Sequence, residues 1–308
     1  MENKARQLHT PLEKRSSHFK GVLCILLSAF FYSLMSLFVR LAGDLPVFQK
    51  SFFRNLVAAL VAFVLLVKDG NFKWQKGSLP ALLARSVAGT IGIVCNFYAI
   101  DHLPISDASI LNKLAPFFSI VFSILILKEK ASWKEWLLVV VAFLGAVFIA
   151  KPSFGFSQGV PVLIGVLGGL GAGLAYTFVR YLGMRGERKA VIVFFFSAFS
   201  CLSMLPMVLL DYQPMETMQA VWLILAGVAA SGAQFTVTAA YSYAPAKDIS
   251  VYDYSQVLFA AVWGAVFLSQ YPDYWSVAGY CIIIGAAVVK WLTSKTKGKK
   301  EQTKNTAE

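Results

Sequence analysis

The chain has 308 residues, of which 57% are hydrophobic and only 14% charged, whereas about 25% of residues are charged in an ordinary soluble domain. Its net charge of +12 could indicate a nucleic-acid partner, but the charges lie in short clusters between long apolar runs, as in a polytopic membrane protein. The four cysteines lie inside apolar runs without a CxxC pair, so the pattern indicates neither a disulfide framework nor a zinc site. We therefore expect a protein surrounded by a lipid bilayer, without nucleic acid as a partner.

The apolar runs predict ten membrane-spanning helices, because each is about as long as a helix needs to cross a hydrocarbon core about 30 Å thick. A polar segment over residues 1–20 precedes the first run, which is too long for a signal peptide and has no A-x-A cleavage site. A basic tail over residues 293–308 lacks apolar anchors and is expected to be disordered. The predicted helices cover residues 21–41, 51–67, 79–100, 105–127, 133–150, 159–182, 190–210, 218–243, 249–268 and 274–292.

One layout occurs twice in the chain, over residues 96–152 and again over residues 238–292. Each copy has a short polar turn, a long apolar run, a charged turn and another apolar run. A period of about 140 residues is too long for a solenoid and indicates a duplicated half-protein. The matched positions include Pro104 with Pro245, Asp107 with Asp248, and Ser109 with Ser250.

The duplication predicts the fold class, an all-α polytopic membrane protein made of two inverted five-helix repeats. The repeats are residues 21–150 and 159–292, joined by a linker over residues 151–158. Because five is an odd number, the second repeat enters the membrane from the opposite side. Such inverted repeats place a substrate site near the middle of the membrane, between the two halves.

The basic residues predict the orientation. When the 28 Lys and Arg are assigned to alternating sides, 22 lie on the side of both termini, three on the other side and three within helices. The positive-inside rule then places both termini in the cytoplasm, so the expected location is the plasma or inner membrane. The high net charge is thus a topology signal, in reach of anionic lipid headgroups.

Sequence signals gather toward the end of the first repeat. They are a Tyr-Ala pair, a proline in mid-helix, a charged turn around a glutamate and a glycine near the end of the fifth helix. These signals are Tyr98-Ala99, Pro116, Lys128-Glu129-Lys130 and Gly145-Ala146, and Arg54 opens the second helix. In this layout the chain resembles the drug/metabolite transporter (DMT) superfamily, EamA type, over about residues 19–292.

The resemblance implies ten helices in two EamA repeats, and secondary transport, often export, of small organic solutes such as amino acids or their derivatives. The chain also departs from the family pattern, so a symmetrical role for the departing residues is not expected. The family's glycine before Glu129 is Lys128, and the second repeat has Gln270, Val257 and Phe194 where the first has Glu129, Pro116 and Arg54.

Lys113 and Asp253 are the strongest candidates for substrate contacts. Each lies inside a span, where a charge costs on the order of 2.5–3.5 kcal/mol, and the two lie on symmetry-related helices. Asn112 is the repeat mate of Asp253. The helical rise predicts about 12 Å between the two charges along the membrane normal, so a permanent direct ion pair is not expected. Instead, we expect a solute between them, or a bridge in one access state only.

Other polar and aromatic residues are candidates for the lining of the same site, although each is individually compatible with helix packing. Arg54 and Glu129 are assigned as gating or structural charges, and Arg85 as an interfacial charge. Glycines 165, 169 and 173 predict a smooth ridge for close helix packing. The candidate lining residues are Asn96, Tyr98, His102, Tyr176, Gln234, Tyr241, Tyr252, Tyr254 and Gln256.

These features predict a carrier that moves small polar or amphiphilic metabolites by alternating access. A membrane enzyme is the first alternative, but the sequence has no HExxH, GxSxG or carboxylate-rich constellation, and no catalytic residue, metal ligand or cofactor is assigned. A scaffold or sensor on a transporter fold is the second alternative.

Overall fold

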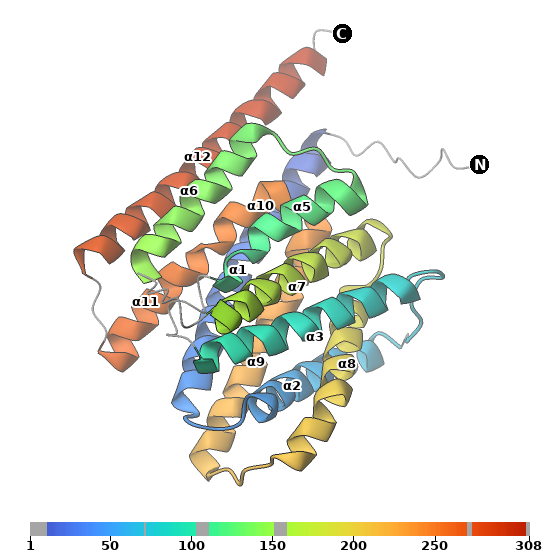
Figure 1. Cartoon of the computed structure of the whole chain (residues 1–308). Helices are drawn as coiled ribbons and strands as arrows, with labels where there is room; N and C mark the ends of the chain where they lie inside the picture. The colour runs from blue at the N-terminus through green and yellow to red at the C-terminus, as the bar shows by residue number, and fades with distance from the viewer. Residues whose placement is uncertain (1–10, 71, 103–110, 151–158, 270–272, 306–308) are drawn as a thin grey trace.

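The computed structural model describes residues 11–70, 72–102, 111–150, 159–269 and 273–305. The matched positions Pro104, Asp107 and Ser109, the linker over residues 151–158, and Gln270 lie outside the described residues. The described secondary structure is helical (Figure 1). The helices are α1 Pro11–Leu41, α2 Val47–Lys68, α3 Leu79–His102, α5 Ala115–Leu127, α6 Trp133–Ala150, α7 Gly159–Met184, α8 Lys189–Leu210, α9 Thr217–Tyr243, α10 Ala246–Asp253, α11 Ser255–Leu268 and α12 Tyr274–Asn305.

These helices form the expected ten spans when α10 and α11 are counted as one interrupted helix. Six described helices (α1, α2, α3, α7, α8 and α9) are long and apolar enough to cross a membrane by themselves, and the apolar parts of α5 and α12 are shorter. The protein is thus an all-α, multi-pass membrane protein.

Both ends of the chain extend the predicted helices. α1 begins at Pro11 rather than at residue 21, and α12 continues to Asn305, through the tail for which disorder was expected. Proline is well tolerated in the first helical turn, and Lys, Glu and Gln are good helix formers. An existing helix also adds residues without a new nucleation cost.

The contacts of α9 establish that the two repeats are inverted. Ser17, near the start of α1, donates to the carbonyl of Tyr243 at the end of α9. Arg180, near the end of α7, donates to the carbonyl of Ser242 in the same last turn of α9. The first helices of the two repeats, α1 and α7, therefore run in opposite directions. We call this end of the bundle the terminus face, and Figure 1 shows α1 beginning and α12 ending on that side.

Helix pairing follows the same two-fold relation. α1 packs along α9, as its repeat mate α7 packs along α3, and α2 with α8 and α6 with α12 pair across the two repeats. The glycines of α7 lie against neighbouring helices, which confirms the prediction of close helix packing. A Cβ at Gly169 would lie 2.7 Å from the carbonyl oxygen of Leu111, and one at Gly173 would lie 2.8 Å from the backbone nitrogen of Ser119. These glycines allow close backbone approach.

The fourth and ninth predicted helices are interrupted, whereas the sequence predicted them to be continuous. Residues 113–114 form a turn before α5, and Tyr254 separates α10 from α11. Pro116 explains the first break, since it lacks an N–H and clashes with the preceding turn of a continuous helix. No proline explains the second break.

The two breaks are stabilised by each other. The hydroxyl of Tyr254 donates to the carbonyl of Lys113 at 3.0 Å, and the Lys113 ammonium lies 3.4 Å from the carbonyl oxygen of Asp253. Carbonyls released by a broken helix must find such partners inside a membrane, where lipid offers none. Each interruption therefore depends on the other repeat.

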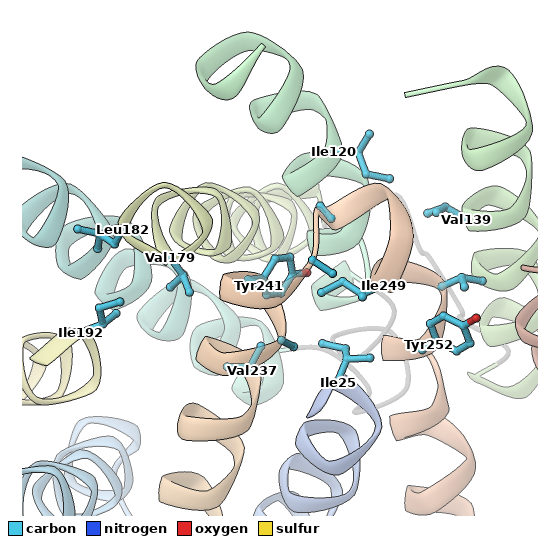
Figure 2. Packing of buried hydrophobic residues seen from close by; sticks show 14 of the residues in the cluster. Ile25, Ile120, Val139, Val179, Leu182, Ile192, Val237, Tyr241, Ile249 and Tyr252 are labelled. Atoms are coloured by element: carbon cyan, nitrogen blue, oxygen red, sulfur yellow. The ribbon is translucent and has the colours of Figure 1, made fainter. Parts of the chain in front are cut away.

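The main apolar core lies in the half of the bundle that is nearer to the terminus face. Figure 2 shows Ile25 of α1, Val237 and Tyr241 of α9, and Ile249 of α10 meeting in this core. All four are buried. This core closes the terminus half of the molecule, whereas the opposite half contains a cavity.

Candidate substrate site

A cavity of about 670 Å³ lies between the two repeats. Its lining includes Tyr32 and Arg54 from the first repeat, and Tyr176 and Gln234 from the second. Exposed residues of the α1–α2 turn, such as Asp44, also line it. The cavity therefore opens at the bundle end opposite the terminus face. Its size suits a small organic molecule.

The inner end of the cavity is formed by the two helix breaks. The Lys113 ammonium lies 3.2 Å from a carboxylate oxygen of Asp253 and donates to Gln256 Oε1 at 2.6 Å. Lys113 and Asp253 are each only 8% exposed. They form one buried, hydrogen-bonded ion pair that joins the two repeats.

This ion pair contradicts the expectation that about 12 Å separates the two charges along the membrane normal. That distance assumed two continuous helices that begin at residues 105 and 249. In the structure α10 begins at Ala246, both helices break beside the charged residues, and a lysine side chain can span the remaining distance.

Two buried arginines line the cavity without a carboxylate partner among the described residues. Arg54 is 3% exposed, and its guanidinium contacts the sulfur of Met35 at 3.0 Å and the amide oxygen of Asn55 at 3.3 Å. The interfacial, snorkelling position considered for Arg54 is therefore wrong, because its guanidinium is buried beside the cavity.

Arg85 is also a cavity residue, so the interfacial position expected from its place in the sequence is wrong. Its guanidinium donates to Gln234 Oε1 at 3.1 Å and lies 3.7 Å from the centre of the Phe196 ring. It is 2% exposed. The side chain points away from the terminus face, so a position two turns into α3 becomes part of the site.

Of the other predicted lining residues, Asn96, Asn112, Tyr176, Gln234 and Gln256 line the cavity. The remaining ones do not, and they have structural contacts instead. Tyr98 stacks on His102, Tyr241 stacks beneath Tyr176, Tyr252 lies in the apolar core, and Tyr254 holds the first helix break.

Glu129 lies far from the cavity, at the terminus face. Its carboxylate lies 3.1 Å from Nε of Arg180, which also donates to Ser242 O at 3.2 Å. This contact joins the end of α5 to α7 and α9, which suits the expected gating or structural role.

A second ionic cluster lies at the same face. Lys290 of α12 is 4% exposed and lies 3.2 Å from Asp248 of α10 and 3.7 Å from Glu135 of α6. Lys247 donates to the carbonyl of Lys130 at 2.6 Å. These contacts bind the two repeats together at the terminus face.

Some lining residues were not anticipated, among them Tyr32, Met35 and Phe196. Apolar and aromatic residues in a span face lipid, a neighbouring helix or a cavity with the same composition, so only helix packing distinguishes them. In the described part of the chain, no cluster of three or more His, Cys, Asp or Glu residues has the geometry of a metal site.

A model of the EamA-like transporter family matches residues 19–151 and 160–291, one match for each repeat. The chain belongs to the EamA-like transporter family. A solved crystal structure shares the fold of this EamA-like chain with a TM-score of 0.79 at 15% identity, covering 90% of this chain and 98% of that one.

Similar sequences include other transporters. The pseudopaline exporter CntI of Pseudomonas aeruginosa (strain UCBPP-PA14) is 35% identical over 277 residues, which are 89% of this chain and 97% of that protein. Human solute carrier family 35 member G1 is 27% identical over 304 residues, covering 89% of this chain and 80% of that protein. The EamA-like protein is thus a membrane transporter of small solutes and not an enzyme.

Proposed function

We propose that this protein exports small organic metabolites, amino-acid-like or otherwise polar, across the plasma or inner membrane by alternating access. The observation that carries the proposal is the cavity between the repeats, which is open at one end and ends at the interlocked breaks of two helices. Discontinuous helices at the interface of inverted repeats are the usual place of a transporter's substrate site.

The residues proposed to contact the solute are the cavity-lining members of the predicted set. Lys113, Asp253 and Gln256 lie at the inner end, and Asn112 and Gln234 line the wall. Arg54 is reassigned from a gating charge to the site. Glu129 keeps a gating role with Arg180.

We further propose that the terminus face lies in the cytoplasm. The support is the excess of Lys and Arg on that side, since 22 of 28 were assigned to it. The structure is then an outward-open state, in which the ionic contacts and the apolar core of the terminus half form the closed inner gate. Export fits the role of the Pseudomonas relative, which is a pseudopaline exporter.

A pair of reporter fusions tests the orientation. A reporter fused after Glu308 should be cytoplasmic, and one placed within residues 211–219 should be external. A cytoplasmic signal from the second fusion would contradict the topology.

Flux from proteoliposomes tests the function. Vesicles that contain the purified full-length protein are loaded with a small-molecule extract of the native host cells. Release is followed by mass spectrometry with an imposed proton gradient, a sodium gradient or neither. We expect one solute, or a small set, to leave wild-type vesicles at least ten times faster than vesicles with Asp253→Asn.

The same measurement separates the alternatives. Chemical conversion of a solute without release would support a membrane enzyme instead. Neither release nor conversion under any of the gradients would leave the scaffold or sensor as the better reading. Either outcome would contradict the proposed transport.

A further inference from the structure

The cavity has an excess of positive charge. Five basic side chains line it (Arg40, Lys50, Arg54, Arg85 and Lys113), against two acidic ones (Asp44 and Asp253). Lys113 and Asp253 neutralise each other at the inner end. Arg54 and Arg85 remain as the buried charges in the wall without a described carboxylate partner.

Arg85 has hydrogen-bonding capacity that the protein does not use. Its Nε–H is buried and has no acceptor among the described residues, while one terminal nitrogen donates to Gln234. A guanidinium offers five N–H donors, and burying it without a counter-charge is unfavourable. The ring of Phe196 offsets only part of that cost.

Arg54 is in a similar position. Its acceptors are a thioether, which is a weak one, the amide oxygen of the neighbouring Asn55 and the hydroxyl of Tyr32. None of these groups is charged. Arg54 and Arg85 both line the same cavity. A bound anion would supply the missing counter-charge.

The first helix break adds to this positive potential, whereas at the second break the C-terminus of α10 offsets part of the N-terminal charge of α11. α5 begins at Ala115 and α11 at Ser255, so both helices direct their N-termini toward the inner end of the cavity. Ala115 and Gln256 line the cavity itself. Helix N-termini carry about half a positive charge each and favour anions.

We propose that Arg54 and Arg85 each bind one carboxylate of the transported solute, which is therefore a small molecule with at least two carboxylate groups. The inference rests on the proposed transport function and names the substrate class of that site. The planar guanidinium matches a carboxylate in a two-bond geometry, so two buried arginines without a described carboxylate partner suit two carboxylates better than one cation or one neutral solute.

The number of carboxylates can be measured on the solute released from the proteoliposomes. Treatment with acidic methanol adds one methyl group to each carboxylate and leaves phosphate groups unmethylated, so the mass increase counts the carboxylates. We expect at least two. A released solute with fewer than two carboxylates, including a phosphate ester, overturns this inference and leaves the transport function standing. No release overturns both.

Arginine variants test the assignment of the two residues. Arg54→Gln and Arg85→Gln should each lower release of the dicarboxylate at least tenfold. Without solute, their melting temperatures should stay equal to or above that of the wild type, because an uncompensated buried charge has been removed. Arg85→Lys, which keeps the charge but not the planar donor pair, should restore part of the release.

The control is Arg185→Gln at the terminus face, where the arginine contacts the Gly77 carbonyl and the Tyr181 ring. It should leave release unchanged. A melting temperature that drops in Arg85→Gln, with release per folded molecule unaltered, would make Arg85 a structural residue and contradict the proposal.

Discussion

The two halves of the bundle are made of the same helices, but they differ in whether their buried charges have partners of opposite charge. In the terminus half, Glu129 pairs with Arg180, and Lys290 with Glu135 and Asp248. In the open half, Arg54 and Arg85 have no described carboxylate partner. Paired charges and apolar packing close one end. At the other end, these two arginines line a cavity that can hold a ligand.

The pair Lys113 and Asp253 lies at the boundary between the two halves, and breaking it should have the largest effect. Removing one partner of a buried ion pair costs about 3–5 kcal/mol. Lys113→Met and Asp253→Asn should therefore each lower the melting temperature and reduce flux at least tenfold. The double variant should recover most of the stability in a fluorescence-detected melting assay, without recovering flux.

Full flux in that double variant would show that the pair only holds the two repeats together. Normal flux in both single variants would exclude both residues from the site.

A change in the packing between the halves should have the next largest effect. Gly169→Leu places a side chain against the Leu111 carbonyl, next to the first helix break, and overpacking of this kind costs about 1–3 kcal/mol. We expect a lower melting temperature and unchanged substrate preference. Gly285→Ala is the control, since a Cβ there meets nothing within 4 Å. A stable Gly169→Leu protein with altered preference would place this ridge in the site instead.

Loosening the closed end should have a smaller effect on stability and a clear effect on access. Glu129→Gln removes the charge that holds Arg180, whose side chain is 15% exposed, so we expect a loss of about 1–2 kcal/mol, between the values for an exposed and a fully buried ion pair. A cysteine introduced at Ser242 should then react faster with a membrane-impermeant thiol reagent added from the terminus side. The reference is the same cysteine without Glu129→Gln.

Asp69→Asn is the matched control for this experiment, because the more exposed Arg188–Asp69 contact, at 3.9 Å, should contribute little. Equal labelling in the Glu129→Gln protein and the reference would argue against a gating role for the Glu129–Arg180 contact.

The smallest expected effect concerns the turn that follows α5. Lys128 has φ 56°, and its repeat mate Ser269 has φ 55°, both in the left-handed region that favours glycine. Lys128→Gly should raise stability by up to about 1 kcal/mol, because a left-handed L-residue costs about 1–2 kcal/mol and glycine loses part of that gain through entropy. Thermal unfolding of Lys128→Gly against Lys128→Ala measures this difference, and a lower midpoint for the glycine variant would contradict it.

The sequence predicted much of this architecture, because apolar run length, duplication and basic asymmetry are properties of the chain itself. The inverted repeats and the ten spans are confirmed. The departure from glycine at Lys128 was also visible, although its left-handed conformation was not. Tyr98, His102 and Tyr252 are not among the residues that line the cavity, since which side of a helix faces the cavity depends on the packing of its neighbours.

The helix breaks explain the other differences. Pro116 predicts the first break. Nothing near Tyr254 in the sequence predicts the second break, which is stabilised by a hydrogen bond to the carbonyl of Lys113. Continuous helices placed Lys113 and Asp253 too far apart, whereas Arg85 was assigned to the interface from its place two turns into α3, without knowledge of the direction of its side chain. A signal for Arg85 was nevertheless present, because a lone arginine two turns into an apolar span requires a polar environment.

The interlock between the two breaks also sets an order for biosynthesis. The carbonyl of Lys113 is bound by a hydroxyl that lies 141 residues later in the chain. At a synthesis rate of about 5–20 residues per second, roughly 7–28 s separate the emergence of the two groups from the ribosome. During that interval the first repeat lies in the membrane with an incomplete fourth helix. The two repeats therefore mature together, and a chain truncated before the ninth helix should be a substrate for membrane quality control.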